Sequence, residues 1–343
     1  MMQRKWVIVI ATAIAVVGCK KKEEAPAPAV EEKATAPEPQ KPAPAEPIIP
    51  LPESVDVNMD KVMLGRSLYH DTVLSGDGTI SCATCHMLDQ GGAEHLKTST
   101  GIKGQKGPIN APTVLNSAYN FVQFWDGRAK DLQEQAAGPV GNPIEMGANW
   151  NEVISKIKKN PEYSEAFDEL YPDGVTKSNI TDAIAEYEKA LITPSRFDAY
   201  LRGDESAITE QEKKGYLTFK EVGCTACHTG INVGGSMFQK LGLVKDYFSD
   251  RGTPLTEADN GRFNVTKNPA DKHFFKVPSL RNVELTAPYL HDGSRETLEE
   301  TVALMGKYQL GRDLTNEQID DIVAFLKSLT GKLPKYAKMP KGS

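Results

Sequence analysis

The sequence predicts an all-α protein, mostly helical with long functional loops. Residues 149–170 and 179–192 space their apolar side chains three and four apart, which is the repeat of an amphipathic helix. Capping boxes at Thr209–Glu212 and Thr315–Gln318 mark the starts of two further helices, and the second is expected to end at Gly331. Strand patterns are few and short, so a sheet is not expected to organise the core.

The N-terminus has the pattern of a bacterial export signal. In residues 1–18, Arg4 and Lys5 precede the apolar run Trp6–Val17, which is too short to span a bilayer. A marginal membrane anchor is the alternative. The run ends in VVGC, which resembles a lipoprotein cleavage site with lipid on Cys19, and several acyl chains on one cysteine make a stable anchor. The sequence therefore predicts a lipid-anchored protein on the periplasmic side of a bacterial membrane.

Behind the predicted anchor, the composition changes. Residues 19–50 consist largely of Lys, Glu, Ala and Pro with almost nothing to bury, which is typical of a solvated tether. Two domains are expected after it, residues 51–204 and residues 205–343, with a hinge near residues 202–207. The net charge of −6 argues against nucleic acid as a partner, although it allows a basic redox partner.

Two CxxCH motifs carry the chemistry. In each, two thiols three residues apart can bond the two vinyl groups of one porphyrin, and the next histidine lies under the iron. The motif residues are Cys82, Cys85 and His86 in the first, and Cys224, Cys227 and His228 in the second. Together with Cys19 they account for all five cysteines, so none remains for a disulfide. Zinc binding or chance is the alternative, but two motifs behind an export signal favour two covalent c-type haems with histidine as proximal ligand.

The second axial ligand of each iron is harder to assign from residues alone. An electron-carrying haem usually takes a methionine or histidine from a distant loop, and Met305 is the candidate for the C-terminal haem. Its helical spacing is equally typical of core packing, so both interpretations stay open.

Longer segments resemble the bacterial di-haem cytochrome c peroxidases. The similarity runs from about Met59 to the C-terminus, and its most specific parts are FWDGRA, starting at Phe124, and LHDGS, starting at Leu290. The metal-reduction-associated di-haem cytochromes are a similar subgroup. The resemblance implies two class-I cytochrome-c-like domains with one haem each, facing each other across an interface that contains calcium.

The resemblance also implies roles for residues near the C-terminal haem. Met305 falls on the methionine ligand of a high-potential haem, and Trp125 falls on the tryptophan that lies between the two haems. Asn110, Thr286 and Pro288 match the calcium-binding positions, the last two through backbone carbonyl oxygens, which a hard cation prefers.

At the N-terminal haem, the resemblance implies a peroxide pocket lined by Glu145 and Gln135. Glu145 would take a proton from the bound peroxide and return it to the leaving oxygen, while Gln135 would orient the peroxide. In many relatives a histidine further along the loop blocks this iron in the oxidised enzyme, but this chain has Ile102 there. His95, in the same loop, either supplies the sixth ligand or leaves the iron open, and the short chain from His86 favours the open site.

Three other histidines complete the set. His70 is a candidate for the pocket wall, and His273 and His291 have no predicted ligand role.

The leading functional hypothesis is reduction of hydrogen peroxide to water, with electrons from a small soluble cytochrome c or similar donor. The alternative is a membrane-tethered di-haem electron-transfer cytochrome in a periplasmic metal-reduction chain. A di-haem oxidase acting on a protein ranks last, because that group has tyrosine where this chain has Met305. The sequence leaves a homodimer open.

Overall fold

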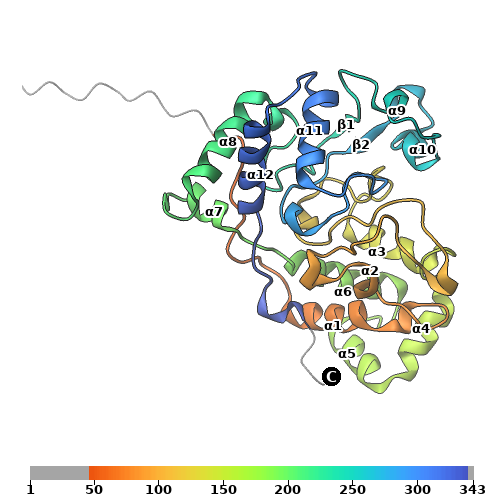
Figure 1. Ribbon diagram of the computed structural model, residues 1–343. Coiled ribbons are helices and arrows are strands. Elements are labelled where there is room, and N and C mark those ends of the chain that lie inside the picture. The colour runs from red at the N-terminus through yellow and green to blue at the C-terminus, as the bar shows by residue number, and fades with distance from the viewer. Residues whose placement is uncertain (1–45, 339–343) are drawn as a thin grey trace, which may run out of the picture. The chain divides into compact units, whose positions relative to one another are not determined.

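The computed structural model describes residues 46–338 (Figure 1). This part of the chain is mostly helical with little strand, which confirms the predicted class. The helices are α1 Met59–His70, α2 Cys82–Cys85, α3 Leu132–Gly141, α4 Trp150–Lys159, α5 Pro161–Leu170, α6 Lys177–Ala190, α7 Arg196–Leu201, α8 Glu210–Val222, α9 Tyr247–Asp250, α10 Phe263–Thr266, α11 Leu298–Gln309 and α12 Asn316–Ser328. Strands β1 Phe238–Lys240 and β2 Phe274–Lys276 pair antiparallel.

The predicted export signal, Cys19 and the tether up to residue 45 lie outside the described residues. Within residues 46–338, the search for a helix long and apolar enough to cross a membrane finds none.

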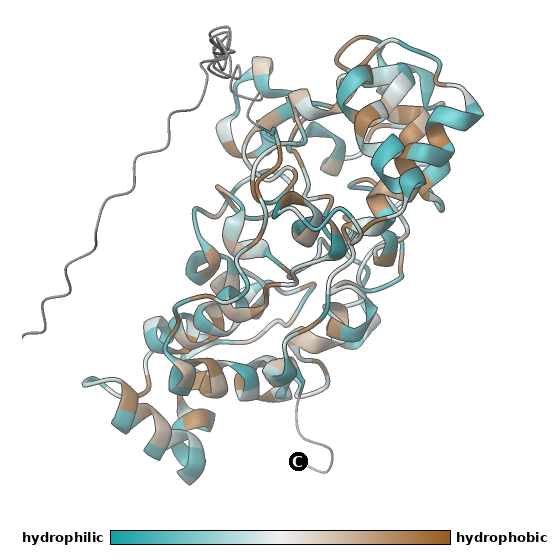
Figure 2. Cartoon of the chain, turned by 90° about the vertical axis from the view of Figure 1, so that its left-hand side faces the viewer, coloured by the Kyte–Doolittle hydropathy of each residue, from teal (hydrophilic) through white to brown (hydrophobic). Residues whose placement is uncertain are grey.

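Helices α1 and α6 form the centre of the N-terminal half. Gly65 lets α1 approach α6 closely, because a Cβ there would lie 1.9 Å from the carbonyl oxygen of Ala183. Both helices turn apolar faces inward, and brown and teal residues alternate along the helices in Figure 2. The resulting core also includes α3, α4 and α5.

The predicted helical stretch 149–170 forms two helices. Asn160 ends α4, and its side-chain oxygen accepts hydrogen bonds from the backbone N–H groups of Glu162 and Tyr163 at the start of α5. Pro161 occupies the first turn of α5, where its missing N–H is not needed. The apolar repeat continues across the break, which is why the sequence pattern alone did not reveal it.

Helices α8 and α12 are the corresponding pair in the C-terminal half. Both predicted capping boxes are present, at Thr209–Glu212 and Thr315–Gln318. The predicted helix end at Gly331 is wrong, because α12 already ends at Ser328. Gly331 instead packs against the segment between α6 and α7, where a Cβ on Gly331 would lie 1.9 Å from the carbonyl oxygen of Thr193.

Each end of the described chain packs on the half that is distant in sequence (Figure 1). Ile48, inside the predicted tether, is buried in the core of α8 and α12 and bridges to Gly230. Ordered chain therefore starts before Leu51. At the other end, Ala337 is buried against α1 and α6.

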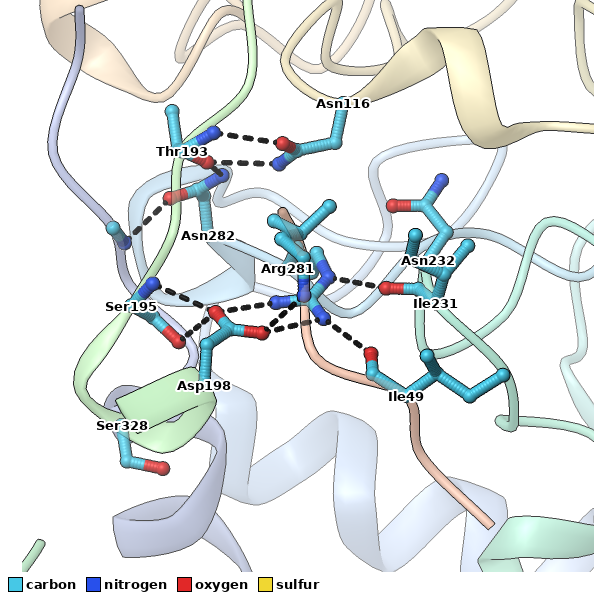
Figure 3. Close-up of polar contacts among 12 residues, drawn as sticks. Ile49, Asn116, Thr193, Ser195, Asp198, Ile231, Asn232, Arg281, Asn282 and Ser328 are labelled. Carbon is cyan, nitrogen blue, oxygen red and sulfur yellow. Dashed lines mark hydrogen bonds and ion pairs between the residues drawn. The ribbon is translucent and has the colours of Figure 1, made fainter. Parts of the chain in front are cut away.

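A buried ion pair holds the N-terminal segment against the C-terminal half. Asp198 on α7 and Arg281 are both fully buried, and their side chains form two hydrogen bonds of 3.0 Å (Figure 3). Asp198 also accepts from the backbone of Leu51 and from Ser195, while Arg281 donates to the carbonyl of Ile49. The segment of residues 49–51, the start of α7 and Arg281 are thus bonded through one pair of charges.

Candidate active site

One cavity in the C-terminal half collects the residues predicted for the second haem and for calcium. It is lined by Cys224, Cys227, His228, Met305, Trp125, Asn110, Thr286 and Pro288 among others. These residues come from the α8–β1 region, from α11 and from two long loops, so the fold brings together positions far apart in sequence.

The two motif histidines are held in the same way. The Nδ1 of His86 lies 3.3 Å from the carbonyl oxygen of Gly92, and that of His228 lies 3.4 Å from the carbonyl oxygen of Val233. A carbonyl only accepts, so Nδ1 carries the proton and Nε2 is left to bind a metal. Burial lowers the pKa of both, that of His228 to about 4, and keeps the imidazoles neutral.

Met305 and Trp125 both pack on one apolar cluster of the C-terminal half and both line the cavity. The indole Nε1 of Trp125 donates to the backbone oxygen of Asn110 at 3.0 Å, which fixes the ring. Its ring meets that of Phe275 edge-on, with centroids 6.3 Å apart. Trp125 is therefore rigidly placed at the cavity wall.

The predicted calcium positions offer oxygen atoms on the same wall. The side-chain nitrogen of Asn110 donates to the carbonyl of Leu96 at 3.0 Å, which uses the amide nitrogen and not the amide oxygen. Thr286 and Pro288 lie on the loop after Leu285 and line the same cavity. Oxygen donors of this kind suit a hard cation.

Glu145 lies at the N-terminal haem motif. It follows α3 in a loop and is near enough to Cys85 to influence the pKa of that thiol. Burial raises the pKa of the Glu145 carboxyl, and Arg128 together with the Asn142 side chain partly opposes the shift. Gln135 lies on α3, which leads into this loop.

The FWDGR segment lines the C-terminal cavity and also packs against the N-terminal half. Trp125 lines the C-terminal cavity, while the Phe124 ring lies against Gly138 of α3. Arg128 stacks over the Phe124 ring at 3.5 Å and acts on the charge of Glu145. One short loop therefore joins the wall of the C-terminal cavity to α3 of the N-terminal half.

The loop that carries His95 and Ile102 is folded back on the Glu145 loop. The N–H of Ile102 donates to the carbonyl of Glu145 at 2.8 Å, and the Ile102 side chain is buried against Gly147. His95 is exposed, and its Nε2 donates to the carbonyl of Leu285 at 3.1 Å.

The remaining histidines have other neighbours. His70 packs edge-on against Tyr69, with ring centroids 5.3 Å apart, and His273 stacks on Phe248 at 4.1 Å. His291 lines the C-terminal cavity, and its Nε2 donates to Asp259 at 2.8 Å.

Asp259, His291 and Asp292 lie close enough together to suggest a metal site. The guanidinium of Arg251 already pairs with both carboxylates, at 2.7 and 3.2 Å. This cation supplies the positive charge that a metal would bring, so the group is an ion-pair network.

The buried charged residues Glu94 and Lys276 were not predicted. Glu94 is 5% exposed and lies near Cys85, and burial raises the pKa of its carboxyl. Lys276 is 6% exposed and lines the C-terminal cavity. A lysine between the apolar residues Phe275 and Val277 is a sequence signal that could have drawn attention to the second.

A family model described as "Di-haem cytochrome c peroxidase" matches residues 59–206. The chain is also 49% identical to cytochrome c551 peroxidase of Nitrosomonas europaea, over 86% of this chain and 87% of that protein. The chain belongs to the di-haem cytochrome c peroxidase family. Cytochrome c551 peroxidase of Pseudomonas aeruginosa is 45% identical over 85% of this chain and 87% of that protein.

Cytochrome c peroxidase Ccp of Escherichia coli is 55% identical over 85% of this chain, and the match spans only 62% of that longer protein. Among solved structures, a MauG-like protein associated with microbial copper homeostasis superposes with a TM-score of 0.73 at 29% identity, covering 85% of this chain and 97% of that one. The di-haem peroxidase BthA of Burkholderia thailandensis shares the fold, with a TM-score of 0.68 at 22% identity, covering 84% of this chain and 89% of that one.

Membership of this family means that the peroxidase carries two c-type haems. The chain fits them, because each CxxCH motif has a neutral histidine with Nε2 available. The C-terminal motif also opens onto a largely apolar cavity that contains a methionine.

Proposed function

We propose that this peroxidase reduces hydrogen peroxide to water at the N-terminal haem, with electrons that enter at the C-terminal haem. The observation that carries the proposal is the FWDGR loop, whose Trp125 lines the C-terminal cavity and whose Phe124 packs against α3, the helix that leads into the Glu145 loop. A simple electron carrier would need no partly buried carboxylate near its haem. Two domains are proposed as the sequence suggested, residues 51–204 for peroxide and residues 205–343 for electron transfer.

The haems, when bound, supply the iron that accepts electrons and peroxide. Glu145 accepts a proton from incoming peroxide and returns it to the leaving oxygen, which its raised pKa favours. Gln135 hydrogen-bonds the peroxide and excludes unproductive orientations. Trp125, fixed through its Nε1, shortens the path that an electron takes between the two sites.

Several finer features belong to the same proposal. His86 and His228 act as proximal ligands, Met305 completes the C-terminal iron, and a calcium ion is held by the Asn110 side chain with the carbonyls of Thr286 and Pro288. The electron donor is a small soluble cytochrome c. Export by residues 1–18, a lipid on Cys19 and a periplasmic location follow from the sequence pattern alone, and a homodimer stays open.

The N-terminal iron is proposed to be open in the oxidised protein. Two contacts support this: His95 is exposed and bonded to Leu285, and Ile102 is fixed by its N–H to Glu145. We therefore expect the fully oxidised protein to oxidise reduced cytochrome c with peroxide at once, without prior reduction. A stopped-flow comparison of oxidised and pre-reduced protein tests the function. Absence of peroxide turnover from both forms would favour the electron-carrier alternative.

Replacing His95 by glycine separates the two interpretations of this loop. Because His95 lies away from the iron in the proposed open state, His95→Gly should leave the rate of cyanide binding and the high-spin ferric signal unchanged in electron paramagnetic resonance. If wild type is instead low-spin and the variant binds cyanide much faster, His95 is the sixth ligand and the open-site proposal is wrong.

Met305 can be tested through the C-terminal haem. Met305→His should keep the iron six-coordinate but lower its midpoint potential, because imidazole stabilises ferric iron more than a thioether does. Met305→Leu should leave the sixth position without a protein ligand. The potential and the absorption spectrum are measured by spectroelectrochemical titration, and an unchanged potential in both variants would return Met305 to a packing role.

A further inference from the structure

The charges in the C-terminal cavity are unbalanced. Among the described residues that line it, Lys276 is the one with a formal positive charge, and the lining includes no aspartate or glutamate. Lys276 is the last residue of β2, and its neighbours Phe275 and Val277 are buried. A cation has therefore been placed in a mostly apolar cavity.

The ammonium group of Lys276 has no partner within residues 46–338. Its backbone N–H donates to the carbonyl oxygen of Trp125 at 2.8 Å, but no hydrogen bond or ion pair reaches Nζ from this part of the chain. Burial alone lowers the pKa of Lys276 to about 8, and no nearby carboxylate raises it again. An unpaired ammonium is strongly unfavourable once a ligand fills the apolar cavity around it, so a counter-charge is expected in the loaded protein.

A c-type haem brings the missing charge. Its thioether bonds use the vinyl groups, which leaves two propionate carboxylates as its charged substituents. We propose that Lys276 binds a propionate of the C-terminal haem and is a positioning residue for electron transfer. This inference rests on the proposed function only in that the cavity holds the haem attached to Cys224 and Cys227.

The ion pair has two consequences. A fixed positive charge near the iron favours the reduced form, because reduction lowers the charge on the iron. The backbone N–H of Lys276 also donates to the carbonyl oxygen of Trp125. The propionate, β2 and Trp125 would therefore be linked through this one residue. Lys276 thereby sets both the affinity of the haem for an electron and the position of the conduit.

The test uses the full chain with both haems loaded. Lys276→Met removes the charge but keeps a side chain of similar length, and Lys276→Arg restores the charge. Lys272→Met is the matched control, since Lys272 is exposed just before β2. Spectroelectrochemical titration of the C-terminal haem gives the midpoint potential of each protein.

We expect Lys276→Met to shift the ferrous-to-ferric ratio about tenfold towards ferric at a fixed potential, equivalent to about 59 mV. Lys276→Arg and Lys272→Met should titrate close to wild type. A wild-type potential in Lys276→Met, with both haems and the Met305 ligand retained, overturns the proposal.

Two further outcomes are informative. If Lys276→Met does not fold, the propionate modes in resonance Raman spectra of wild type and Lys276→Arg decide the question. They should differ if the side chain bonds a propionate, and identical modes overturn the proposal. Failure of the proposed function looks different, because wild type would then show a normal titration of the C-terminal haem but no peroxide turnover.

Discussion

Replacing Glu145 by glutamine should lower the turnover number for peroxide by about 10²–10⁴-fold, since that is the usual contribution of a general acid–base group. The variant keeps the size and hydrogen-bonding capacity of the side chain but cannot move a proton. Both haem spectra and the midpoint potentials should stay as in wild type. The decisive measurement is steady-state oxidation of reduced cytochrome c as a function of peroxide concentration.

The role of Glu145 also predicts in which direction activity changes with pH. Burial raises the pKa of Glu145, and the group must be ionised to accept the proton of peroxide. Activity should therefore fall as the pH drops through this raised pKa, and this acidic limb should vanish in Glu145→Gln. Glu152→Gln, on the exposed start of α4, is the control. Full activity in Glu145→Gln would mean that another group moves the proton.

The second large effect is expected on stability. Asp198→Asn should lower the free energy of unfolding by about 3–5 kcal/mol, because Arg281 would remain buried opposite a neutral partner. The asparagine could accept only part of the bonds that Ser195, Leu51 and Arg281 now donate to the carboxylate. Denaturant unfolding of the haem-loaded protein, followed by far-ultraviolet circular dichroism, measures the loss.

An exposed ion pair is the matched control. Glu210 and Lys213 form a salt bridge on the surface of α8, in which the Glu210 side chain is 90% exposed, so Glu210→Gln should change stability by about 0.2–1 kcal/mol at most. If Asp198→Asn lowered the free energy of unfolding by no more than this control, the Asp198–Arg281 pair of Figure 3 would not be a major source of stability.

The sequence predicted well whatever depends on neighbouring residues. The capping boxes at Thr209–Glu212 and Thr315–Gln318 place a hydroxyl and its partner three residues apart, and both form. The two CxxCH motifs could be recognised in the same way, because their cysteines and histidine are also close in sequence. Helix ends were less reliable, because Asn160 interrupts an apolar repeat without changing it.

Features that join distant segments could not be predicted in this way. Asp198 and Arg281 are ordinary charged residues in sequence, and only the folded chain shows that they bury each other. Lys276 and Arg128 likewise owe their importance to what the fold places opposite them. The assignments of Glu145, Gln135 and the calcium positions came from family resemblance, and no local spacing rule would have supplied them.

The exchange of terminal segments limits how the protein can be divided. Ile48 completes the core around α8 and α12, and Ala337 completes the core around α1 and α6, so each half contains a piece from the other end of the chain. A gene cut near residues 202–207 would give two fragments that each lack part of their own core. The two haem-bearing halves are therefore not independent modules. A one-haem version of either half would need the terminal segment around Ile48 or Ala337 that completes its core.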